Sequence, residues 1–302
     1  SVQKNFTRKI VSPTLPKTEI IGISSMFSHE WLYTRDCINL IKEKFPNAKI
    51  IAGGEHVTAL PEYCLRDCNS IDYIALGEGE ETWSEILNSD SDNLDDIKGL
   101  AHLKKHGITD QYIQTEPRTR IKHIDEIPWP DWKVFPIEPY LDNAVSFGPG
   151  SGRNMPILAS RGCPYECTFC SNPLMFGRRF YTREIGDLIN QIKYYIKEYQ
   201  ITGLQFYDLT IIVKKQWIME FCKALKENNI NLEWSLPSGT RSEALDLEVL
   251  QSLASVNLTY LVYAPESGSA ETLKAIKKKV KIPRMEQSIK YAISEGIAVR
   301  TN

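Results

Sequence analysis

The chain alternates short apolar segments with amphipathic stretches in two separate blocks, and this alternation limits its possible folds more than any other feature. Residues 19–88 contain three apolar, β-branched segments and residues 156–302 contain five, separated by stretches of helical periodicity. A helix that connects two strands returns the chain to the same end of the sheet, which makes the strands parallel. The sequence therefore predicts two α/β units.

The first block has polar loops directly after its strands. We expect strands at 19–25, 49–54 and 73–76, with helices at about 30–45, 58–67 and 80–87. This order indicates a partial doubly wound, flavodoxin-like parallel sheet, in which ligands bind beyond the carboxyl ends of the strands. Glycines at such turns let backbone amides approach a ligand, although small residues at strand ends are common in any α/β fold. The loops are Ser24-Ser25-Met26, Gly53-Gly54-Glu55-His56 and Gly77-Glu78-Gly79-Glu80.

The second block has the pattern of a βα-barrel that stops in its fifth strand. The expected strands are 156–160, 203–208, 232–237, 258–264 and 297–302, and the expected helices are 183–199, 214–228, 246–255, 270–278 and 284–295. Both ends of the chain look cut, since it opens without a start methionine and residues 297–302 read as an interrupted strand. We therefore expect a fragment of a longer protein, in which the first strand of the first α/β unit is missing.

A connector lies between the two blocks. We expect domains at residues 1–98 and 151–302, with the connector at 99–150. The stretch 99–115, around Lys104-Lys105-His106-Gly107, predicts a β-hairpin. The run from Ile127 to Trp132 is rich in proline and tryptophan and is typical of a stiff strut between domains.

Composition excludes several classes of protein. The 36 Lys and Arg residues nearly balance the 38 Asp and Glu residues, so no charge pattern indicates a nucleic-acid or membrane partner. No apolar run approaches the length of a transmembrane helix. Seven cysteines, an odd number, together with the lack of a secretory h-region, predict a reducing, cytoplasmic location.

Three of these cysteines form a Cys-x3-Cys-x2-Cys triplet at Cys163, Cys167 and Cys170. Three thiolates on one loop can hold a cubane iron–sulfur cluster and leave its fourth iron open to bind another molecule. A zinc site of three cysteines and one histidine is an alternative, but no histidine is near in sequence and no second knuckle follows. Simple packing of the cysteines fits poorly with the loop residues Gly162 and Pro164.

The triplet resembles the signature of the radical S-adenosylmethionine (radical SAM) superfamily, with Phe169 at the aromatic position before the last cysteine. The resemblance implies a [4Fe–4S] cluster on Cys163, Cys167 and Cys170, with SAM chelating the fourth iron. Reduction of the cluster would split SAM into methionine and a 5′-deoxyadenosyl radical that abstracts hydrogen from a substrate. It also implies a partial (β/α)6 barrel with its chemistry at the carboxyl ends of the strands.

Polar residues that follow the second, third and fourth barrel strands are the expected SAM contacts. Arginine can bind the methionyl carboxylate, and a carboxylate can accept from the ribose hydroxyls or the amino group. Structural ion pairs of Arg241 and Asp208 are the alternative, and the lysine run at 277–279 is interpreted as a solvated helix end. The candidates are Phe169, Asp208, Ser238, Arg241, Glu266 and Ser267, of which Glu266-Ser267-Gly268 resembles the Glu-Ser-Gly of many family members.

The loops of the first block resemble the cobalamin-binding domain that precedes the barrel in one large radical SAM group. That domain carries a Ser-x-Leu element and, nearly thirty residues later, a Gly-Gly pair. Methionine replaces the leucine here, and the family's optional Asp-x-His-x-x-Gly element would lie before residue 1. The implied cobalamin contacts are Ser24, Ser25, Met26, Gly53, Gly54, His56, Gly77 and Gly79.

These resemblances imply a cobalamin-dependent radical SAM enzyme that transfers a methyl group to an unactivated centre of an unidentified small molecule. A donor such as flavodoxin or ferredoxin would supply its electrons. One alternative is an oxidative cyclase or rearrangement enzyme like the anaerobic magnesium-protoporphyrin ester cyclases. Another is a non-catalytic iron–sulfur or zinc protein. Methylthiotransferases carry a second cysteine triplet that this chain lacks, and the sequence assigns no catalytic residue.

Overall fold

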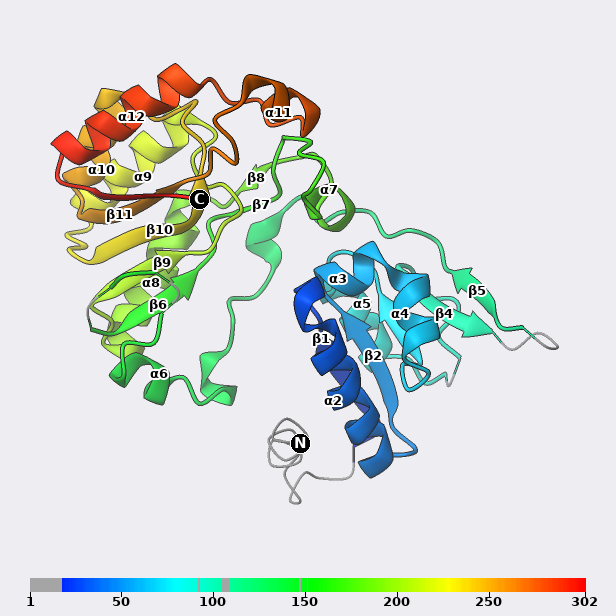
Figure 1. Ribbon diagram of the computed structural model, residues 1–302. Coiled ribbons are helices and arrows are strands. Elements are labelled where there is room, and N and C mark those ends of the chain that lie inside the picture. Colours follow the sequence, from blue (N-terminus) through cyan, green and yellow to red (C-terminus); the bar gives the residue numbers. More distant parts are fainter. Residues whose placement is uncertain (1–17, 92, 105–108, 147, 151) are drawn as a thin grey trace. The chain divides into compact units, whose positions relative to one another are not determined.

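The computed structural model describes residues 18–302 except 92, 105–108, 147 and 151 (Figure 1). The chain forms two compact units. The first unit runs to Ile121 and also includes Ser171–Gly177. The second unit comprises Lys122–Cys170 and Arg178–Asn302.

The first unit is a five-stranded mixed sheet in the order β1-β2-β3-β4-β5. Its first three strands are parallel, and the last two are antiparallel additions. The strands are β1 (Ile20–Ser24), β2 (Lys49–Gly53), β3 (Tyr73–Ala75), β4 (Leu100–Lys104) and β5 (Gln111–Gln114). The helices are η1 (Ser28–Glu30), α2 (Trp31–Lys44), α3 (Glu55–Ala59), α4 (Pro61–Asp67), α5 (Glu80–Leu87) and α7 (Asn172–Met175).

Helices cover both faces of this sheet, as the doubly wound prediction requires. Alternate residues of β2 point to opposite faces, so Ile50 packs in a cluster with α2 and α4 while Ile51 packs in another with α5. A Cβ at Gly22 of β1 would lie 2.8 Å from the Trp83 ring of α5, so the close packing of this helix depends on glycine. The predicted partial doubly wound fold is confirmed.

The hairpin predicted at 99–115 is present as β4 and β5, but it does not belong to a separate connector. Strand β4 pairs with β3, so the hairpin extends the first sheet, and the first unit continues to Ile121. Trp132 of the expected strut donates its indole N–H to the Tyr195 hydroxyl at 2.9 Å and lies in the second unit. The residues 105–108 at the hairpin turn lie outside the described residues.

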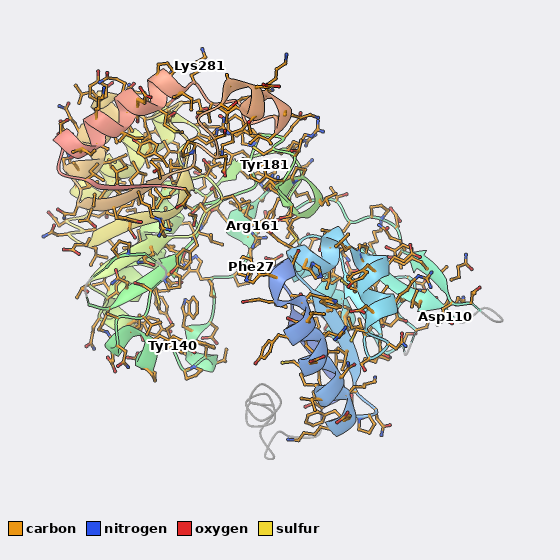
Figure 2. The ribbon with its side chains drawn as sticks, in the orientation of Figure 1. Phe27, Asp110, Tyr140, Arg161, Tyr181 and Lys281 are labelled. Carbon is orange, nitrogen blue, oxygen red and sulfur yellow. The ribbon has the colours of Figure 1, made fainter. Side chains whose placement is uncertain are left out.

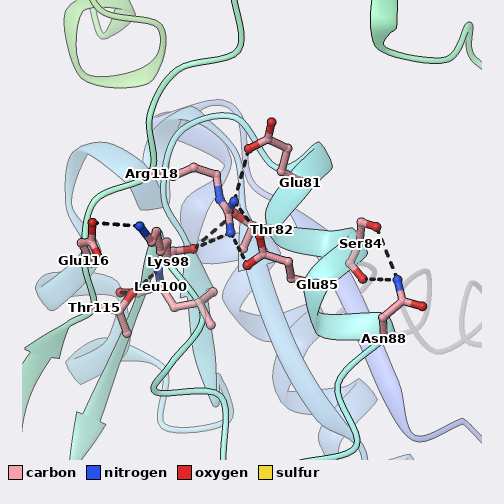
Figure 3. Close-up of polar contacts among 10 residues, drawn as sticks. All are labelled: Glu81, Thr82, Ser84, Glu85, Asn88, Lys98, Leu100, Thr115, Glu116 and Arg118. Atoms are coloured by element: carbon pink, nitrogen blue, oxygen red, sulfur yellow. Dashed lines mark hydrogen bonds and ion pairs between the residues drawn. The ribbon is translucent and has the colours of Figure 1, made fainter.

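Arg118 fastens the chain that leaves this hairpin to α5 (Figure 3). Its guanidinium donates to Glu85 at 2.9 and 2.6 Å and to Glu81 at 3.2 Å, and its Nε donates to the Thr82 hydroxyl at 2.8 Å. The same side chain donates to the carbonyl of Lys98 at 3.2 Å. This bidentate clamp fixes the course of residues 115–121 along the first unit.

The second unit has a five-stranded, fully parallel sheet in the order β12-β11-β10-β9-β6. One apolar core lies between the sheet and its helices. The strands are β6 (Asn154–Ile157), β9 (Gly203–Phe206), β10 (Glu233–Thr240), β11 (Leu258–Tyr263) and β12 (Ala298–Thr301). The helices are η2 (Ile124–Glu126), η3 (Trp132–Val134), α6 (Glu138–Asp142), α8 (Ile185–Tyr199), α9 (Lys215–Glu227), α10 (Leu247–Ala254), α11 (Ala270–Ala275) and α12 (Ile282–Ser294).

The expected strands and crossover helices of the second block are all present, in the arrangement of a partial barrel. The first expected strand, 156–160, divides into β6 and the short β7 (Ser160–Arg161). Strand β7 pairs with β8 (Tyr181–Thr182), and Figure 2 labels the paired residues Arg161 and Tyr181. Because all five main strands are parallel, their carboxyl ends share one edge of the sheet.

No helix among the described residues is both long enough and apolar enough to cross a membrane. The seven cysteines, all of them among the described residues, form no disulfide bond.

Candidate functional site

The cysteine triplet lies on the loop that follows β7 in the second unit. Gly162 opens the loop with a φ of +85°, a conformation that glycine adopts without strain. Cys163 and Cys167 are half-buried, whereas Cys170 and Phe169 are exposed. The loop therefore presents its thiols at the surface of the unit.

The three thiols are close enough to influence one another. Burial raises the pKa of Cys163 above its usual range, the backbone N–H of Tyr165 opposes this, and the Cys170 and Cys167 thiolates raise it further. Bound iron cations would relieve this mutual repulsion, so the donor set fits a cluster.

Within the described ranges, no group of three or more His, Cys, Asp or Glu side chains is placed to hold a metal ion. A single metal ion requires several side chains around one point. In a cubane each thiolate binds a different iron, so its cysteines stand further apart.

Asp208 anchors the start of this loop. Its two carboxylate oxygens each accept from the Ala159 N–H at 3.1 Å, and Oδ1 also accepts from the Ser160 hydroxyl. The side chain is 4% exposed, and burial raises the pKa of Asp208 to about 6. Its contacts are thus hydrogen bonds to β7 and the residue before it, not the structural ion pair considered as an alternative.

Arg241 lies against the loop. The centre of its guanidinium is 3.5 Å from the Tyr165 ring, between Cys163 and Cys167 in sequence. Nη2 and Nε donate to Glu243 at 2.8 and 3.2 Å, and Nη2 also donates to the Lys279 carbonyl. Nη1 is buried without a hydrogen-bond partner. The ion pair expected as the alternative is present, since Arg241 pairs with Glu243. A ligand carboxylate would satisfy the remaining donor, Nη1, so Arg241 also fits the role expected for it at the SAM methionyl group.

Glu266 and Ser267 follow β11 at the same edge of the sheet. Glu266 has a φ of +65°, which is strained for a residue other than glycine, and its carboxylate accepts from Lys278 Nζ at 2.9 Å. The Ser267 hydroxyl accepts from the Ser269 N–H at 3.1 Å. Ser238 is exposed but lies within β10, because that strand extends to Thr240 and not to 237.

The interpretation of the lysine run as a solvated helix end is wrong for its central member. Lys277 and Lys279 are exposed, but Lys278 is buried and paired with Glu266.

In the first unit, the Ser25 and Gly-Gly loops come together at the carboxyl ends of β1 and β2. The Ser25 N–H donates to the Gly53 carbonyl at 2.7 Å, and the His56 N–H donates to the Ser25 carbonyl at 3.1 Å. Gly54 has a φ of +106°, and a Cβ there would lie 2.6 Å from the Ser25 carbonyl oxygen. The Ser25 hydroxyl is buried without a partner. A tight glycine turn beside an unsatisfied hydroxyl fits a cofactor that approaches the backbone.

The remaining cobalamin candidates differ in their surroundings. Ser24 and Met26 are exposed at the end of β1. Gly77 has a φ of +73° and donates its N–H to the Thr58 hydroxyl at 3.1 Å, while a Cβ at Gly79 would meet nothing within 4 Å. Gly77 also lines a cavity of about 460 Å³, whose other walls include Glu78, Arg118, Arg120, Met175 and Phe176.

The ring of His56 is occupied within the first unit. Nδ1 lies 2.9 Å from the Ser28 hydroxyl, and Nε2 lies 3.5 Å from the Cys64 sulfur. The ring also packs on Trp31, and burial lowers the pKa of His56, which favours the neutral form. Both nitrogens have protein partners, so this arrangement does not offer the imidazole to a cofactor.

Family models match both units. Residues 157–302 match the model of the Radical SAM superfamily, and residues 15–87 match the B12 binding domain. The chain carries a Radical SAM domain and a B12-binding domain.

The relatives of this radical SAM chain include methyltransferases. An uncharacterized methyltransferase of Pyrococcus horikoshii is 28% identical over 92% of the chain, which covers 58% of that protein. The cytidylyl-2-hydroxyethylphosphonate methyltransferase of Streptomyces wedmorensis is 29% identical over 93% of the chain and 56% of that protein. The anaerobic magnesium-protoporphyrin IX monomethyl ester cyclase of Cereibacter sphaeroides is 24% identical over 84% of the chain and 41% of that protein. The chain thus spans about half the length of these curated relatives.

Solved radical SAM structures share the fold. OxsB, a cobalamin-dependent S-adenosylmethionine radical enzyme solved with aqua-cobalamin and SAM, has a TM-score of 0.77 at 19% identity, over 99% of this chain and 42% of its own. TsrM from Kitasatospora setae, a radical SAM methyltransferase, has a TM-score of 0.71 at 16% identity. The match covers 99% of this chain and 58% of TsrM. The radical SAM domain takes a [4Fe–4S] cluster with SAM, and the B12-binding domain takes cobalamin.

Sequence reasoning missed several residues of this radical SAM domain that contact the expected site residues. Tyr165 could have been noted, because an aromatic residue within the cysteine triplet has little reason to be on an exposed loop. Ser160 and Lys278 gave no signal, since tertiary contacts bring them to their partners Asp208 and Glu266. Glu243 could have been noted, because it lies two residues from Arg241 and carries the opposite charge.

Proposed function

We propose that the protein is a cobalamin-dependent radical SAM methyltransferase that acts on an unactivated centre of a small molecule. The observation that carries this proposal is the orphan Nη1 of Arg241 beside the cysteine loop, on a chain that also holds a B12-binding domain. Two curated relatives that are named as methyltransferases match more than nine tenths of the chain.

Different residues of the second unit would bind the cluster and SAM. Cys163, Cys167 and Cys170 would hold the cluster, and Arg241 Nη1 would pair with the SAM carboxylate. Glu266, Ser267 and Ser238 lie at the strand edge where an acceptor for the ribose or amino group is required. When bound, the cluster and SAM supply a 5′-deoxyadenosyl radical, and methylcobalamin supplies the methyl group.

The first unit would bind cobalamin through backbone contacts. Gly53 and Gly54 bring the chain close to the Ser25 loop, and the Ser25 hydroxyl is available as a donor or acceptor. Ser24, Met26, Gly77 and Gly79 complete the proposed set. His56 would contribute its backbone, because its ring is held by Ser28 and Cys64.

An oxidative cyclase or rearrangement enzyme is the second candidate, because relatives named as magnesium-protoporphyrin cyclases also match most of the chain. Either reaction requires an external electron source. We propose a flavodoxin or ferredoxin as donor in a reducing cytoplasm, which agrees with seven described cysteines that form no disulfide bond.

Anaerobic reconstitution of the full-length protein tests the proposal. We expect iron and sulfide in the ratio of a [4Fe–4S] cluster, retention of a corrinoid, and release of 5′-deoxyadenosine from SAM with a reductant. Transfer of a deuterated methyl group from labelled SAM to an acceptor would distinguish methyl transfer from cyclisation. Zinc without sulfide would overturn the cluster, and the absence of any corrinoid spectral change would overturn the methyltransferase assignment. The Cys167→Ala variant is the matched control without cluster.

A further inference from the structure

Lys278 is buried, although the lysines on either side of it in the sequence are exposed. Of the lysines that the structure describes, it alone is buried, with 8% of the residue exposed. Its ammonium donates to Glu266 Oε1 at 2.9 Å. Taking an ammonium out of water is strongly unfavourable unless its partners compensate, so a buried lysine requires an explanation.

The partner carboxylate is itself in an unusual conformation. Glu266 is a non-glycine residue with a φ of +65°, which is a strained backbone conformation. It persists because the Glu266 N–H donates to the Asn302 carbonyl at 3.4 Å and the carboxylate is held by Lys278. Strain of this kind is concentrated at ligand sites, where it sets the direction of a side chain.

The turn that carries Lys278 also contacts the other parts of the site. The Ile276 carbonyl accepts from the Thr168 N–H at 3.1 Å, within the cysteine loop between Cys167 and Cys170. The Lys279 carbonyl accepts from Arg241 Nη2. One four-residue turn, 276–279, therefore holds the cysteine loop, Arg241 and Glu266 together.

A role in stability explains this arrangement poorly. Buried ion pairs contribute little net stability, because desolvation offsets the attraction, and an apolar side chain of similar size often does as well. Here the pair is also asymmetric, since the side chain of Lys278 is 7% exposed and that of Glu266 is 30% exposed. A partly exposed, oriented carboxylate with a buried cation behind it is suited to binding a ligand.

We propose that Lys278 is a positioning residue of the SAM site, which orients Glu266 and fixes the turn that holds the cysteine loop and Arg241. The inference rests on the proposed function in one respect, that SAM is the ligand at this edge. Lys278 acts through Glu266, so the two side chains form one functional element.

The test uses the full-length protein with its reconstituted cluster and measures SAM binding without turnover. Loss of a hydrogen bond to a charged group corresponds to about a tenfold loss of affinity or more. We expect Lys278→Met and Glu266→Gln each to raise the SAM dissociation constant by about this factor, with iron content unchanged. The double variant is expected to be no worse than either single variant, because the two side chains act as a unit.

Two further variants separate positioning from simple packing. Lys278→Arg keeps the cation and is expected to recover most of the affinity. Lys274→Met changes an exposed side chain of α11, outside the 276–279 turn, and is expected to bind SAM as the wild type does. The electron paramagnetic resonance spectrum of the reduced cluster provides a second readout. We expect SAM to change it fully in the wild type and incompletely in Lys278→Met.

A third readout needs no cofactor. In the apoprotein, acylation followed by mass spectrometry should label Lys278 far more slowly than Lys279, and Glu266→Gln should accelerate labelling of Lys278 selectively. Wild-type affinity for SAM in Lys278→Met would overturn the inference. If that variant loses its cluster, wild-type affinity in Glu266→Gln would overturn it instead. A wild-type protein with an intact cluster that does not bind SAM would overturn the proposed function, and the inference with it.

Discussion

Ser171, the residue that follows Cys170, donates a hydrogen bond to the carboxylate of Glu55, the residue that follows Gly54. Helix α7 packs on α3 in the same unit, and a Cβ at Gly77 would lie 3.4 Å from the Met175 carbonyl oxygen. The segment that leaves the cysteine loop is therefore held by the loops assigned to cobalamin. Residues 171–177 belong to the first unit for this reason.

Replacing Ser171 by alanine is expected to loosen this segment. A hydrogen bond to a charged group contributes about 1.5–3 kcal/mol, less where water competes, and α7 has only four residues to compensate. We expect trypsin to cleave faster after Arg178, whose side chain is 68% exposed. Glu55→Gln, which keeps an acceptor but removes the charge, should show an intermediate rate. Equal cleavage rates in Ser171→Ala and wild type would contradict the assigned contact.

The stack of Arg241 on Tyr165 gives a second prediction. A desolvated cation–π contact contributes about 2 kcal/mol, and here it holds the guanidinium whose Nη1 awaits a ligand. We expect Tyr165→Leu to retain its iron but to bind SAM several-fold more weakly, as measured by equilibrium dialysis. Tyr165→Phe keeps the ring and is expected to bind as the wild type does. Weakened binding in both variants would assign the effect to the hydroxyl and not to the stack.

Local periodicity was sufficient to predict most elements of the fold. Apolar residues at Leu188, Ile189 and Ile192 predicted the buried face of α8, and the alternation around β4 and β5 predicted the hairpin. The sequence did not predict which strand the hairpin pairs with. The pairing of β4 with β3 depends on tertiary contacts between segments that are separated in the sequence. For the same reason the sequence divided the chain at 98, whereas the first unit continues to Ile121.

The candidate site divides in a similar way. The cysteine spacing and the glycine pairs could be recognised in the sequence, because cluster binding and tight turns each require particular residues at short spacing. The burial of Lys278 was not, since three consecutive lysines read as solvated until tertiary contacts place one of them behind Glu266. His56 was predicted as a cofactor contact from its loop, but its ring partners, Ser28 and Cys64, lie on other elements.

Asp208 makes stability depend on pH. Burial raises its folded-state pKa to about 6, above the value of about 3.9 expected in the unfolded chain. The neutral form is thus favoured by folding, so its stabilising contribution is complete below pH 4 and is lost as pH rises to 6. Two pKa units correspond to roughly 3 kcal/mol.

Urea unfolding of the apoprotein at a series of pH values measures this effect. The free energy of unfolding of the wild type minus that of Asp208→Asn is expected to fall between pH 4 and 6 and to be constant above pH 7. Asp246 serves as the control, because its pKa is lowered, with burial opposed by hydrogen bonds from Lys215 and the Val249 N–H. Asp246→Asn should therefore show the opposite slope. A pH-independent difference for Asp208→Asn would contradict the assignment.

Substitutions of glycines in the first unit can distinguish residues required for folding from residues required for cobalamin binding. Gly54 has a left-handed backbone, and a Cβ there would meet the Ser25 carbonyl at 2.6 Å, so Gly54→Ala is expected to destabilise the unit by at least 1–2 kcal/mol, about the cost of the backbone conformation alone. A Cβ at Gly53 would make an ordinary contact at 3.9 Å with the Ala75 carbonyl oxygen, and one at Gly79 would meet nothing within 4 Å. Gly53→Ala and Gly79→Ala are therefore expected to fold normally, with unchanged melting temperatures.

Corrinoid retention then distinguishes these two positions. If Gly53 is glycine because cobalamin approaches the backbone there, Gly53→Ala should lose the corrinoid while its thermal unfolding stays that of the wild type. The open surroundings of Gly79 leave space for a methyl group, so Gly79→Ala should retain the corrinoid and serve as the matched control. Full corrinoid retention by Gly53→Ala would contradict the proposed contact between Gly53 and cobalamin. The packing around Gly53 leaves space for a methyl group, so a bound cofactor is the proposed reason for glycine at that position.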